Sequence, residues 1–442
     1  MAEQITHICK RTVVSTKPVE AGKFVPLSVL DRLMERNHLR IVYYFQTPKG
    51  MELGETTKKL RESMSEMLTT FPVLTGRLVK GQDGHWMIKC NDAGVRGVEA
   101  TAKGSVEEWL ENVDKEKELT LIHWEEMFQN PYFWSTFYVQ LTEFEEGGLA
   151  IGLSCFHLLA DLTCAAMFIK AWADITLTGK MISPPLFHPL PPRRPGNTDP
   201  YHLPYTHLIN YYKSTLEKTY LVTDTAHGYA TIALLFKDPM VRACIAAARA
   251  TSARNGPNPS PFQALSGLFW GCISKAKGKK YGLVDMCVCL DMRKMLGLDY
   301  GYFGNCTVYN KIQPKSSNPT VDIVEEMAKM DIEGMLDLIE WLQSNDWQST
   351  SWMNGGDLIC GNLEGVNPYF SMFEEGFAPI RVSHYVEPVG GAGYVLVVPA
   401  PPGEGEMARV VMVTLPEDEM VRLCKDDLLL GFSPITLMGL KK

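Results

Sequence analysis

The stretch GLAIGLSCFHLLADLTCAAMFIKAWAD, residues 148–174, changes its hydrophobic period in the middle. Before His157 the residues form an apolar run with strand character, which follows a second such run, residues 136–144, across a Glu-Glu-Gly-Gly turn. After Asp161, apolar residues from Leu162 to Ile169 recur at the spacing of an amphipathic helix. We therefore expect a hairpin whose second strand ends at His157, followed by a helix that begins at Asp161.

Similar patterns recur along the chain, and their period predicts the type of each element. The predicted elements are a helix start followed by a strand (27–45), a helix (53–72), a strand (229–236), a helix (260–280), a strand (282–294), two strands joined by a Pro/Gly loop (393–415) and a helix with Pro416 in its first turn (416–430). Both halves of the chain are therefore expected to mix α and β structure.

The length of 442 residues is too great for one ordinary hydrophobic core, so we expect two domains. The strongest change in composition is residues 183–205, which contain eight prolines and cannot form a regular helix or an inner strand. This segment is interpreted as a crossover between domains. The predicted organisation is an N-terminal domain over residues 1–182, a crossover over 183–220 and a C-terminal domain over 221–442.

Composition and charge restrict the class of protein. The net charge of −8 argues against nucleic acid as the main partner, because phosphate neutralisation requires a basic face. The eleven cysteines contain no CxxC pair and follow no apolar leader, which indicates a reducing, cytoplasmic compartment. No apolar run approaches the roughly 20 residues of a membrane-spanning helix. We expect a soluble or at most peripheral protein.

His157 and Asp161 are the candidates for chemistry. A neutral imidazole can accept a proton from a hydroxyl or amine during attack, which suits acyl transfer, whereas an aspartate at a helix N-terminus is favoured there by unpaired N–H groups. The alternative is a buried core histidine beside a helix cap. A metal site is disfavoured because no third ligand cluster accompanies the pair, and the motifs of serine hydrolases, P-loop enzymes, dehydrogenases and zincins are absent.

Four sequence elements in order resemble the plant BAHD acyl-CoA-dependent acyltransferases. The HxxxD motif of that family matches His157 to Asp161, and its early Leu-Ser-x-Leu-Asp element matches residues 27–31. The run FPVLTGRL, residues 71–78, and the run LDMRKMLGLDYGYFGNC, residues 290–306, match two further elements. A single pentapeptide is weak support, but four elements in the family order favour a functional role for His157.

The resemblance implies a fold and a set of roles. The fold is α/β and similar to chloramphenicol acetyltransferase, with two domains, a crossover loop and an interdomain channel. The family assigns the general base to the position of His157 and a structural role to that of Asp161, which would pair with Arg293. Acyl-CoA would be the co-substrate and a small-molecule hydroxyl or amine the acceptor, with no permanent cofactor and no metal. We expect a monomer.

The sequence departs from the family at residues 373–377. FEEGF replaces the structural motif Asp-Phe-Gly-Trp-Gly, while the following Pro379 to Val382 are kept. This departure, together with residues 27–45, resembles the eceriferum subgroup, whose members are tied to very-long-chain fatty acid elongation in cuticular wax formation. Two function classes stay open: an acyltransferase, and a non-catalytic accessory protein that contacts a condensing enzyme at the endoplasmic reticulum.

Two further groups of residues are candidates for the reaction that the resemblance implies. Asn362 is a candidate oxyanion donor, and its alternative is a turn residue beside Gly361. Four lysines near the end of the predicted helix 260–280 are candidates for the phosphates of coenzyme A, with a solvated helix end as the alternative. These lysines are Lys275, Lys277, Lys279 and Lys280.

Overall fold

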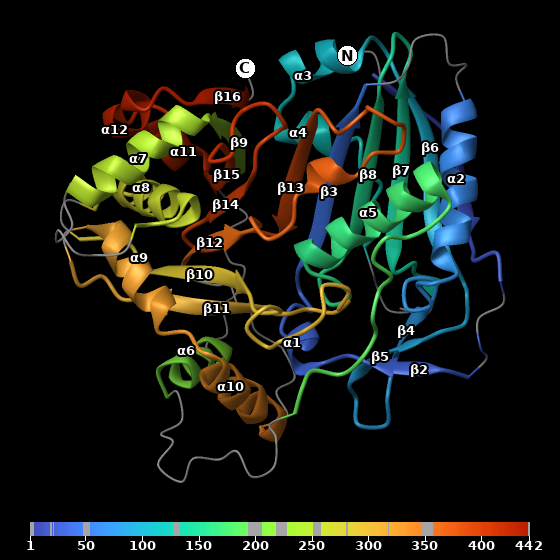
Figure 1. The fold of residues 1–442 in the computed structure, drawn as a ribbon, viewed down its shortest axis with the longest axis horizontal. Coiled ribbons are helices and arrows are strands. Elements are labelled where there is room, and N and C mark those ends of the chain that lie inside the picture. The colour runs from blue at the N-terminus through green and yellow to red at the C-terminus, as the bar shows by residue number, and fades with distance from the viewer. Residues whose placement is uncertain are drawn as a thin grey trace. The chain divides into compact units, whose positions relative to one another are not determined.

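The computed structural model describes residues 4–17, 20, 22–46, 54–126, 133–192, 206–217, 228–250, 258–279, 282–316, 318–345 and 357–440. The chain divides into two compact units (Figure 1). The first contains residues 1–189, 299–305 and 367–388, and the second contains the remainder. Two segments from the C-terminal half of the chain therefore belong to the first unit.

The first unit is built on a six-stranded sheet with the order β1-β6-β7-β8-β3-β13 and a smaller sheet with the order β2-β5-β4. Its elements are β1 (Ile5–Val13), β2 (Phe24–Pro26), α1 (Val29–Arg32), β3 (His38–Phe45), α2 (Glu55–Leu68), β4 (Arg77–Lys80), β5 (Trp86–Lys89), β6 (Val95–Ala102), α3 (Val106–Glu111), α4 (Lys115–Leu119), β7 (Phe137–Phe144), β8 (Leu149–Phe156), α5 (Leu162–Thr178), η2 (Pro368–Phe370) and β13 (Arg381–Glu387).

The predicted hairpin and helix are confirmed as β7, β8 and α5. Every residue of β7 is buried, because α5 and α2 lie on one side of the sheet and the segment after α3 lies on the other (Figure 1). Gly152 of β8 permits that second layer: a Cβ there would lie 2.0 Å from the carbonyl oxygen of Leu121. The hydroxyl of Ser154 also donates to the carbonyl oxygen of His123 at 2.6 Å.

Strand β13 completes the large sheet by pairing antiparallel with β3. The buried carboxylate of Glu118 of α4 joins β13 to β3. It accepts hydrogen bonds from Ser383 of β13 at 3.0 Å, from Tyr44 of β3 at 2.8 Å and from Tyr385 of β13. The guanidinium of Arg381 lies 3.8 Å from the same carboxylate. A segment distant in sequence is thus held by a fully buried charged cluster.

The second unit is built on a seven-stranded mixed sheet with the order β11-β10-β12-β14-β15-β9-β16. Its elements are α6 (Thr206–Glu217), β9 (Tyr229–Phe236), α7 (Asp238–Ala250), α8 (Pro261–Ala276), β10 (Met286–Asp291), β11 (Thr307–Ile312), α9 (Pro319–Ala328), α10 (Ile332–Ser344), β12 (Leu358–Asn362), β14 (Tyr394–Pro399), β15 (Arg409–Pro416), α11 (Glu417–Leu423), α12 (Asp427–Gly431) and β16 (Ile435–Met438).

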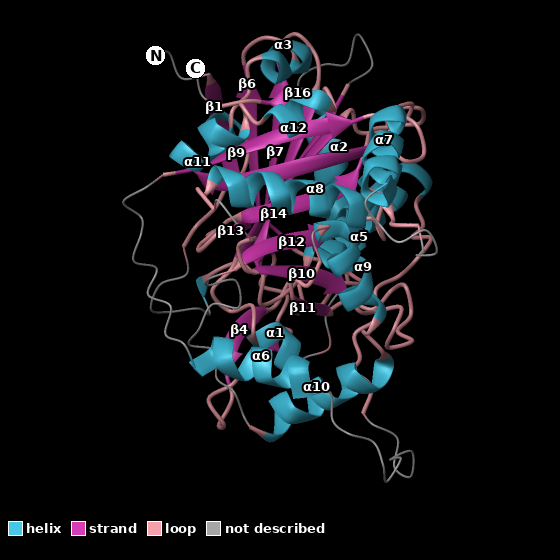
Figure 2. Cartoon of the chain, turned by 90° about the vertical axis from the view of Figure 1, so that its left-hand side faces the viewer, coloured by secondary structure: helices cyan, strands magenta, loops and turns pink. Residues whose placement is uncertain are grey.

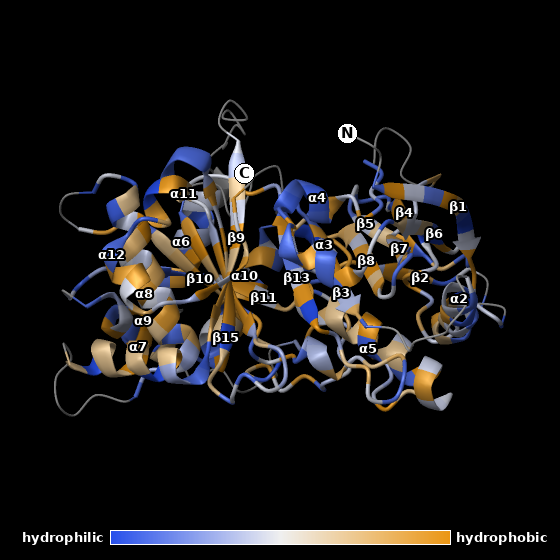
Figure 3. Ribbon diagram, turned by 90° about the horizontal axis from the view of Figure 1, so that it is seen from above, coloured by the Kyte–Doolittle hydropathy of each residue, from blue (hydrophilic) through white to orange (hydrophobic). Residues whose placement is uncertain are grey.

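Helices α7, α8, α9 and α11 cover one face of this sheet, and α6 packs with α10 (Figure 2). Hydrophobic residues concentrate along the strands (Figure 3), and the core between sheet and helices includes the buried side chains of Phe262, Phe269 and Trp270 of α8. The indole of Trp270 donates to the carbonyl oxygen of Val284 at 2.8 Å, so α8 is fixed to the segment that leads into β10.

The prediction of a single C-terminal helix over residues 416–430 is wrong. The structure has two short helices there, α11 and α12. Asp426 begins the second: its carboxylate accepts from the backbone N–H groups of Leu428 and Leu429, which is the geometry of a helix N-cap. Helix α7, between the predicted strand 229–236 and the predicted helix 260–280, was not expected.

The predicted crossover between the domains, residues 183–220, is described only in part. Residues 193–205 and 218–227 of the predicted crossover lie outside the described residues, and the predicted domain boundaries stay a prediction. Within the described ranges, no helix is long and apolar enough to cross a membrane. All eleven cysteines fall in those ranges and are free thiols.

Candidate active site

The junction between β8 and α5 places His157 and Asp161. The strand ends at Phe156, and Asp161 is the N-cap of α5, where its Oδ1 accepts from the backbone N–H of Cys164 at 2.9 Å. His157 is only 4% exposed, and its backbone N–H donates to the carbonyl oxygen of Asn37 at 2.9 Å. The predicted strand end and helix start are confirmed.

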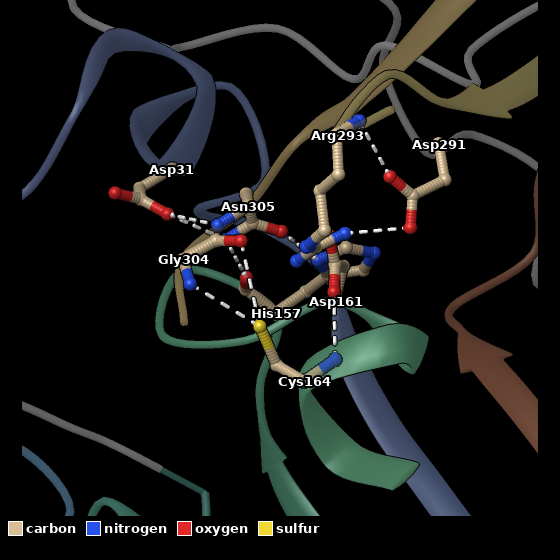
Figure 4. A network of polar contacts seen from close by, with 8 residues as sticks. All are labelled: Asp31, His157, Asp161, Cys164, Asp291, Arg293, Gly304 and Asn305. Carbon is tan, nitrogen blue, oxygen red and sulfur yellow. Dashed lines mark hydrogen bonds and ion pairs between the residues drawn. The ribbon is translucent and has the colours of Figure 1, made fainter. Parts of the chain in front are cut away.

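Asn305 fixes the protonation of the His157 ring (Figure 4). The amide nitrogen Nδ2 of Asn305 donates to Asp31 Oδ1 and to the carbonyl oxygen of His157, both at 2.8 Å. The amide oxygen Oδ1 therefore faces Nδ1 of His157, at 2.9 Å. An amide oxygen can only accept, so Nδ1 carries the hydrogen of the neutral imidazole, and Nε2 keeps its lone pair.

Asp31 holds Asn305 in this orientation. Its Oδ1 accepts from both the backbone N–H and the Nδ2 of Asn305, each at 2.8 Å, and its Oδ2 accepts from the backbone N–H of Ser28 at 2.7 Å. With Ser28 it also forms the capping box that begins α1. Burial raises the pKa of Asp31, and these hydrogen bonds act in the opposite direction. One carboxylate therefore begins a helix and orients the partner of the histidine.

The segment that carries Asn305 is anchored along its length. Leu186 pairs with it in the manner of a strand: the Leu186 N–H donates to the Gly301 carbonyl at 2.7 Å, and the Phe303 N–H donates to the Leu186 carbonyl at 2.9 Å. The ring of Phe303 packs edge-on against Phe71, with centroids 5.5 Å apart. The 71–78 element of the sequence thus supports the 302–305 element, which in turn contacts His157.

The thiol of Cys164 adds a contact at the next residue of that segment. Sγ accepts from the backbone N–H of Gly304 at 3.2 Å and donates to the Gly304 carbonyl oxygen at 3.4 Å (Figure 4). The first turn of α5 is therefore joined directly to the residue before Asn305.

Burial sets the charge of His157. Removal from water lowers the pKa of the imidazole below its ordinary value, and the nearby Asp161 carboxylate opposes this shift without reversing it. A neutral ring with its lone pair on Nε2 can accept a proton from a hydroxyl or amine at neutral pH. The arrangement is therefore chemically suited to general-base catalysis.

Arg293 and Asn362, two further candidates from the sequence, belong to the second unit. Arg293 is buried and contacts Asp291, with its backbone N–H on Oδ1 at 2.9 Å and Nη1 on Oδ2 at 2.7 Å. Asn362 ends β12, and its Oδ1 accepts from the backbone N–H of Glu364 at 2.8 Å, as in an Asx turn. The pairing of Arg293 with Asp161 and the oxyanion role of Asn362 stay predictions.

Three of the four candidate lysines for coenzyme A phosphates, Lys275, Lys277 and Lys279, lie at or just after the end of α8. Lys275 is ion-paired with Asp426 at 2.8 Å, and Lys277 is paired with Glu419. Lys279 is exposed, and Lys280 lies outside the described residues. Two of these lysines thus have carboxylate partners within the unit, and their contact with phosphates stays a prediction.

Sequence reasoning did not assign a role to three residues of this network, Asn305, Asp31 and Cys164. The first two stand inside elements that the family resemblance had matched, so the motifs themselves carried the signal. Among the described residues, no group of three or more His, Cys, Asp or Glu side chains is arranged to hold a metal ion.

The comparisons with known proteins identify the family. The family model described as "Transferase family" matches residues 3–429, and the chain therefore belongs to this family, that of the BAHD acyltransferases, which use acyl-CoA as co-substrate. The sequence is 26% identical over 420 residues to Protein ECERIFERUM 26 of Arabidopsis thaliana, covering 93% of this chain and 92% of the relative. It is 26% identical over 433 residues to rosmarinate synthase of Plectranthus scutellarioides, covering 94% and 97%.

Solved structures agree on the fold. The crystal structure of vinorine synthase is similar with a TM-score of 0.70 at 19% identity, covering 97% of this chain and 98% of that chain. The structure of F. sporotrichioides TRI101 complexed with coenzyme A and T-2 is similar with a TM-score of 0.72 at 14% identity, covering 94% and 100%. The predicted two-domain mixed α/β fold class is confirmed.

Replacing Asp31 with alanine should destabilise the protein. Three buried or half-buried donors, on Asn305 and Ser28, lose their acceptor, which should lower the free energy of unfolding by roughly 1 to 3 kcal/mol. Urea unfolding followed by circular dichroism measures this. Asp83→Ala is the matched control, because Asp83 is exposed and caps only a local turn at His85. Equal midpoints for the two variants would contradict the role given to Asp31.

Proposed function

We propose that this protein transfers an acyl group from coenzyme A to the hydroxyl or amine of a small acceptor, with His157 as the general base. The observation that carries the proposal is the Asn305 amide oxygen at 2.9 Å from Nδ1 of His157, which leaves Nε2 as the proton acceptor. Membership of the acyltransferase family supports the reaction class.

In the proposed reaction, Nε2 takes the proton of the acceptor hydroxyl or amine while its oxygen or nitrogen attacks the thioester carbonyl. The tetrahedral intermediate then expels coenzyme A as a thiolate, which takes the proton back from the imidazolium. Asn305 accepts from Nδ1–H throughout and so keeps the ring in one orientation. Asp161, two per cent exposed at the start of α5, favours the transient positive charge on the ring.

A second function is favoured by residues 373–377 and by the similarity to Protein ECERIFERUM 26. In this hypothesis the chain is a non-catalytic accessory protein of very-long-chain fatty acid elongation and acts through its surface on a condensing enzyme at the endoplasmic reticulum. Such a protein would not need a base at Nε2. The two functions therefore differ in whether they require the His157 side chain.

Replacement of His157 by alanine should leave a folded protein whose kcat/KM is about 10² to 10⁴ times lower, because a general base is removed. The assay tests purified protein with acetyl-, malonyl-, hydroxycinnamoyl- and long-chain acyl-CoA and follows release of the thiol. His7→Ala on the exposed side of β1 is the control and should retain activity. Undiminished turnover in His157→Ala would exclude the proposed base.

The pH profile should reflect the lowered pKa of His157. The base is active only when neutral, so a folded-state pKa below the ordinary 6.5 keeps it active to more acidic pH. We expect the acid limb of kcat/KM to have an apparent pKa below 6.5 and activity to be lost as the pH falls through that value. An acid limb above 6.5 would show that burial does not control this ring.

The accessory function is tested in a host that expresses an elongation enzyme together with wild type or His157→Ala. Under the catalytic proposal the variant should lose the effect of the wild type on the lipid chain-length profile, measured by gas chromatography. Western blotting controls for equal amounts of protein. If the variant shifts products to longer chains as well as wild type does, the accessory function is supported and the catalytic one is rejected.

A further inference from the structure

The thiol of Cys164 forms hydrogen bonds with both backbone polar groups of Gly304. It is fully buried in the first turn of α5, and it accepts from the N–H and donates to the carbonyl oxygen of Gly304. A thiol donates through its one hydrogen and accepts weakly through its sulfur, so a single side chain can make both contacts. Gly304 has no side chain with which to anchor itself, and the next residue is Asn305.

We propose that Cys164 is a positioning residue of the active site, which fixes the Gly304 peptide so that the Asn305 amide oxygen stays against Nδ1 of His157. The inference rests on the proposed function of His157 as the base. It adds a residue whose side chain does not touch the substrate and acts through two neighbours.

The geometry explains why the position of Gly304 matters. Asp31 accepts from the backbone N–H and the side-chain amide of Asn305, so it sets which way the amide points. The peptide group on the other side of Gly304, between Phe303 and Gly304, donates its N–H to the sulfur of Cys164 instead. If this peptide shifts, the 2.9 Å contact between Asn305 and His157 lengthens, and the ring can adopt the other tautomer with its hydrogen on Nε2. That tautomer cannot accept the acceptor's proton.

The same contacts connect Asp161 to the imidazole of His157 through residues of the first unit. Its carboxylate accepts from the backbone N–H of Cys164 at 2.9 Å and so fixes the start of the helix from which the thiol projects. The series Asp161, Cys164, Gly304, Asn305 and His157 is connected by hydrogen bonds of 2.8 to 3.4 Å and by the peptide bond between Gly304 and Asn305. The helix cap therefore contributes to the orientation of the imidazole as well as to the stability of α5.

The test uses three substitutions in the full-length protein. Cys164→Ala removes both contacts, Cys164→Val removes them while filling the space, and Cys164→Ser keeps a group that donates and accepts. Cys155→Ala is the matched control: Cys155 is a fully buried thiol on β8, two residues before His157, outside the series of contacts with Gly304. Thermal unfolding establishes which variants are folded.

The first measurement is the tautomer of His157 from ¹⁵N chemical shifts of labelled histidine, assigned with His157→Ala. Wild type, Cys155→Ala and Cys164→Ser should show hydrogen on Nδ1, whereas Cys164→Ala and Cys164→Val should show averaging between the two nitrogens. This readout needs no substrate. It therefore still decides the inference if the protein turns over no acyl-CoA and the proposed function fails.

The second measurement is kinetic, with the donor that wild type turns over. We expect Cys164→Ala and Cys164→Val to lower kcat about 10- to 100-fold with little change in KM, because the base is misplaced while binding is kept. Cys164→Ser should retain more activity than either. In a protein that already carries Asn305→Ala, adding Cys164→Ala should have no further effect on kcat, because the Asn305 contact through which Cys164 acts on His157 is already lost.

The inference is overturned by an Nδ1 hydrogen that persists in both Cys164→Ala and Cys164→Val. It is also overturned if Cys164→Ser behaves like Cys164→Val, which would show that volume rather than polarity matters. If Cys164→Ala does not fold, Cys164→Val and Cys164→Ser decide the question by the same two criteria.

Discussion

The candidate active site depends on the single orientation that is open to the amide of Asn305. Two acceptors, the Asp31 carboxylate and the His157 carbonyl, face its nitrogen, so its oxygen must face the imidazole. Reversing the amide would place its oxygen against both acceptors and leave a buried polar group unpaired, which is costly. The tautomer of His157 is thus set by acceptors that lie outside the ring itself. Segments 274 and 148 positions away along the chain must meet at Asn305 for the proposed base to be held in this tautomer.

Residues 373–377 depart from the family pattern, yet two of them, Phe373 and Glu374, make contacts with other elements of the first unit. The ring of Phe373 packs edge-on against Trp172 of α5 at 5.0 Å and against Phe45 of β3 at 5.5 Å. Glu374 is paired with Lys59 of α2. The segment is therefore anchored on the same helices and strand that surround the hairpin, and β13 follows it in full register with β3. Loss of the family motif does not by itself displace His157, the proposed base, because other residues hold its ring.

The sequence could predict the elements whose signal is local. The apolar run before His157 and the helical spacing after Asp161 predicted a strand and a helix, because a short apolar run is typical of a strand buried on both faces and the helical spacing reflects the buried side of a helix. The break at Asp426 was missed because a helix cap within an acidic, apolar run looks like continued helix until its carboxylate is seen on Leu428 and Leu429. The role of Asn305 was out of reach for a different reason: it follows from the direction of its amide, which Asp31 and His157, both distant in sequence, decide together.

Two opposing effects act on the charge of His157, and their balance suits a base better than either alone. Burial disfavours the imidazolium and keeps the resting ring neutral, so a proton acceptor is available before the substrate arrives. Asp161 favours the imidazolium, so the charge that forms during proton transfer is not left wholly uncompensated in a buried place. The position of Asp161 at a helix cap, where its Oδ1 is engaged by the N–H of Cys164, moderates that influence, because part of its negative charge is already neutralised by the helix N-terminus.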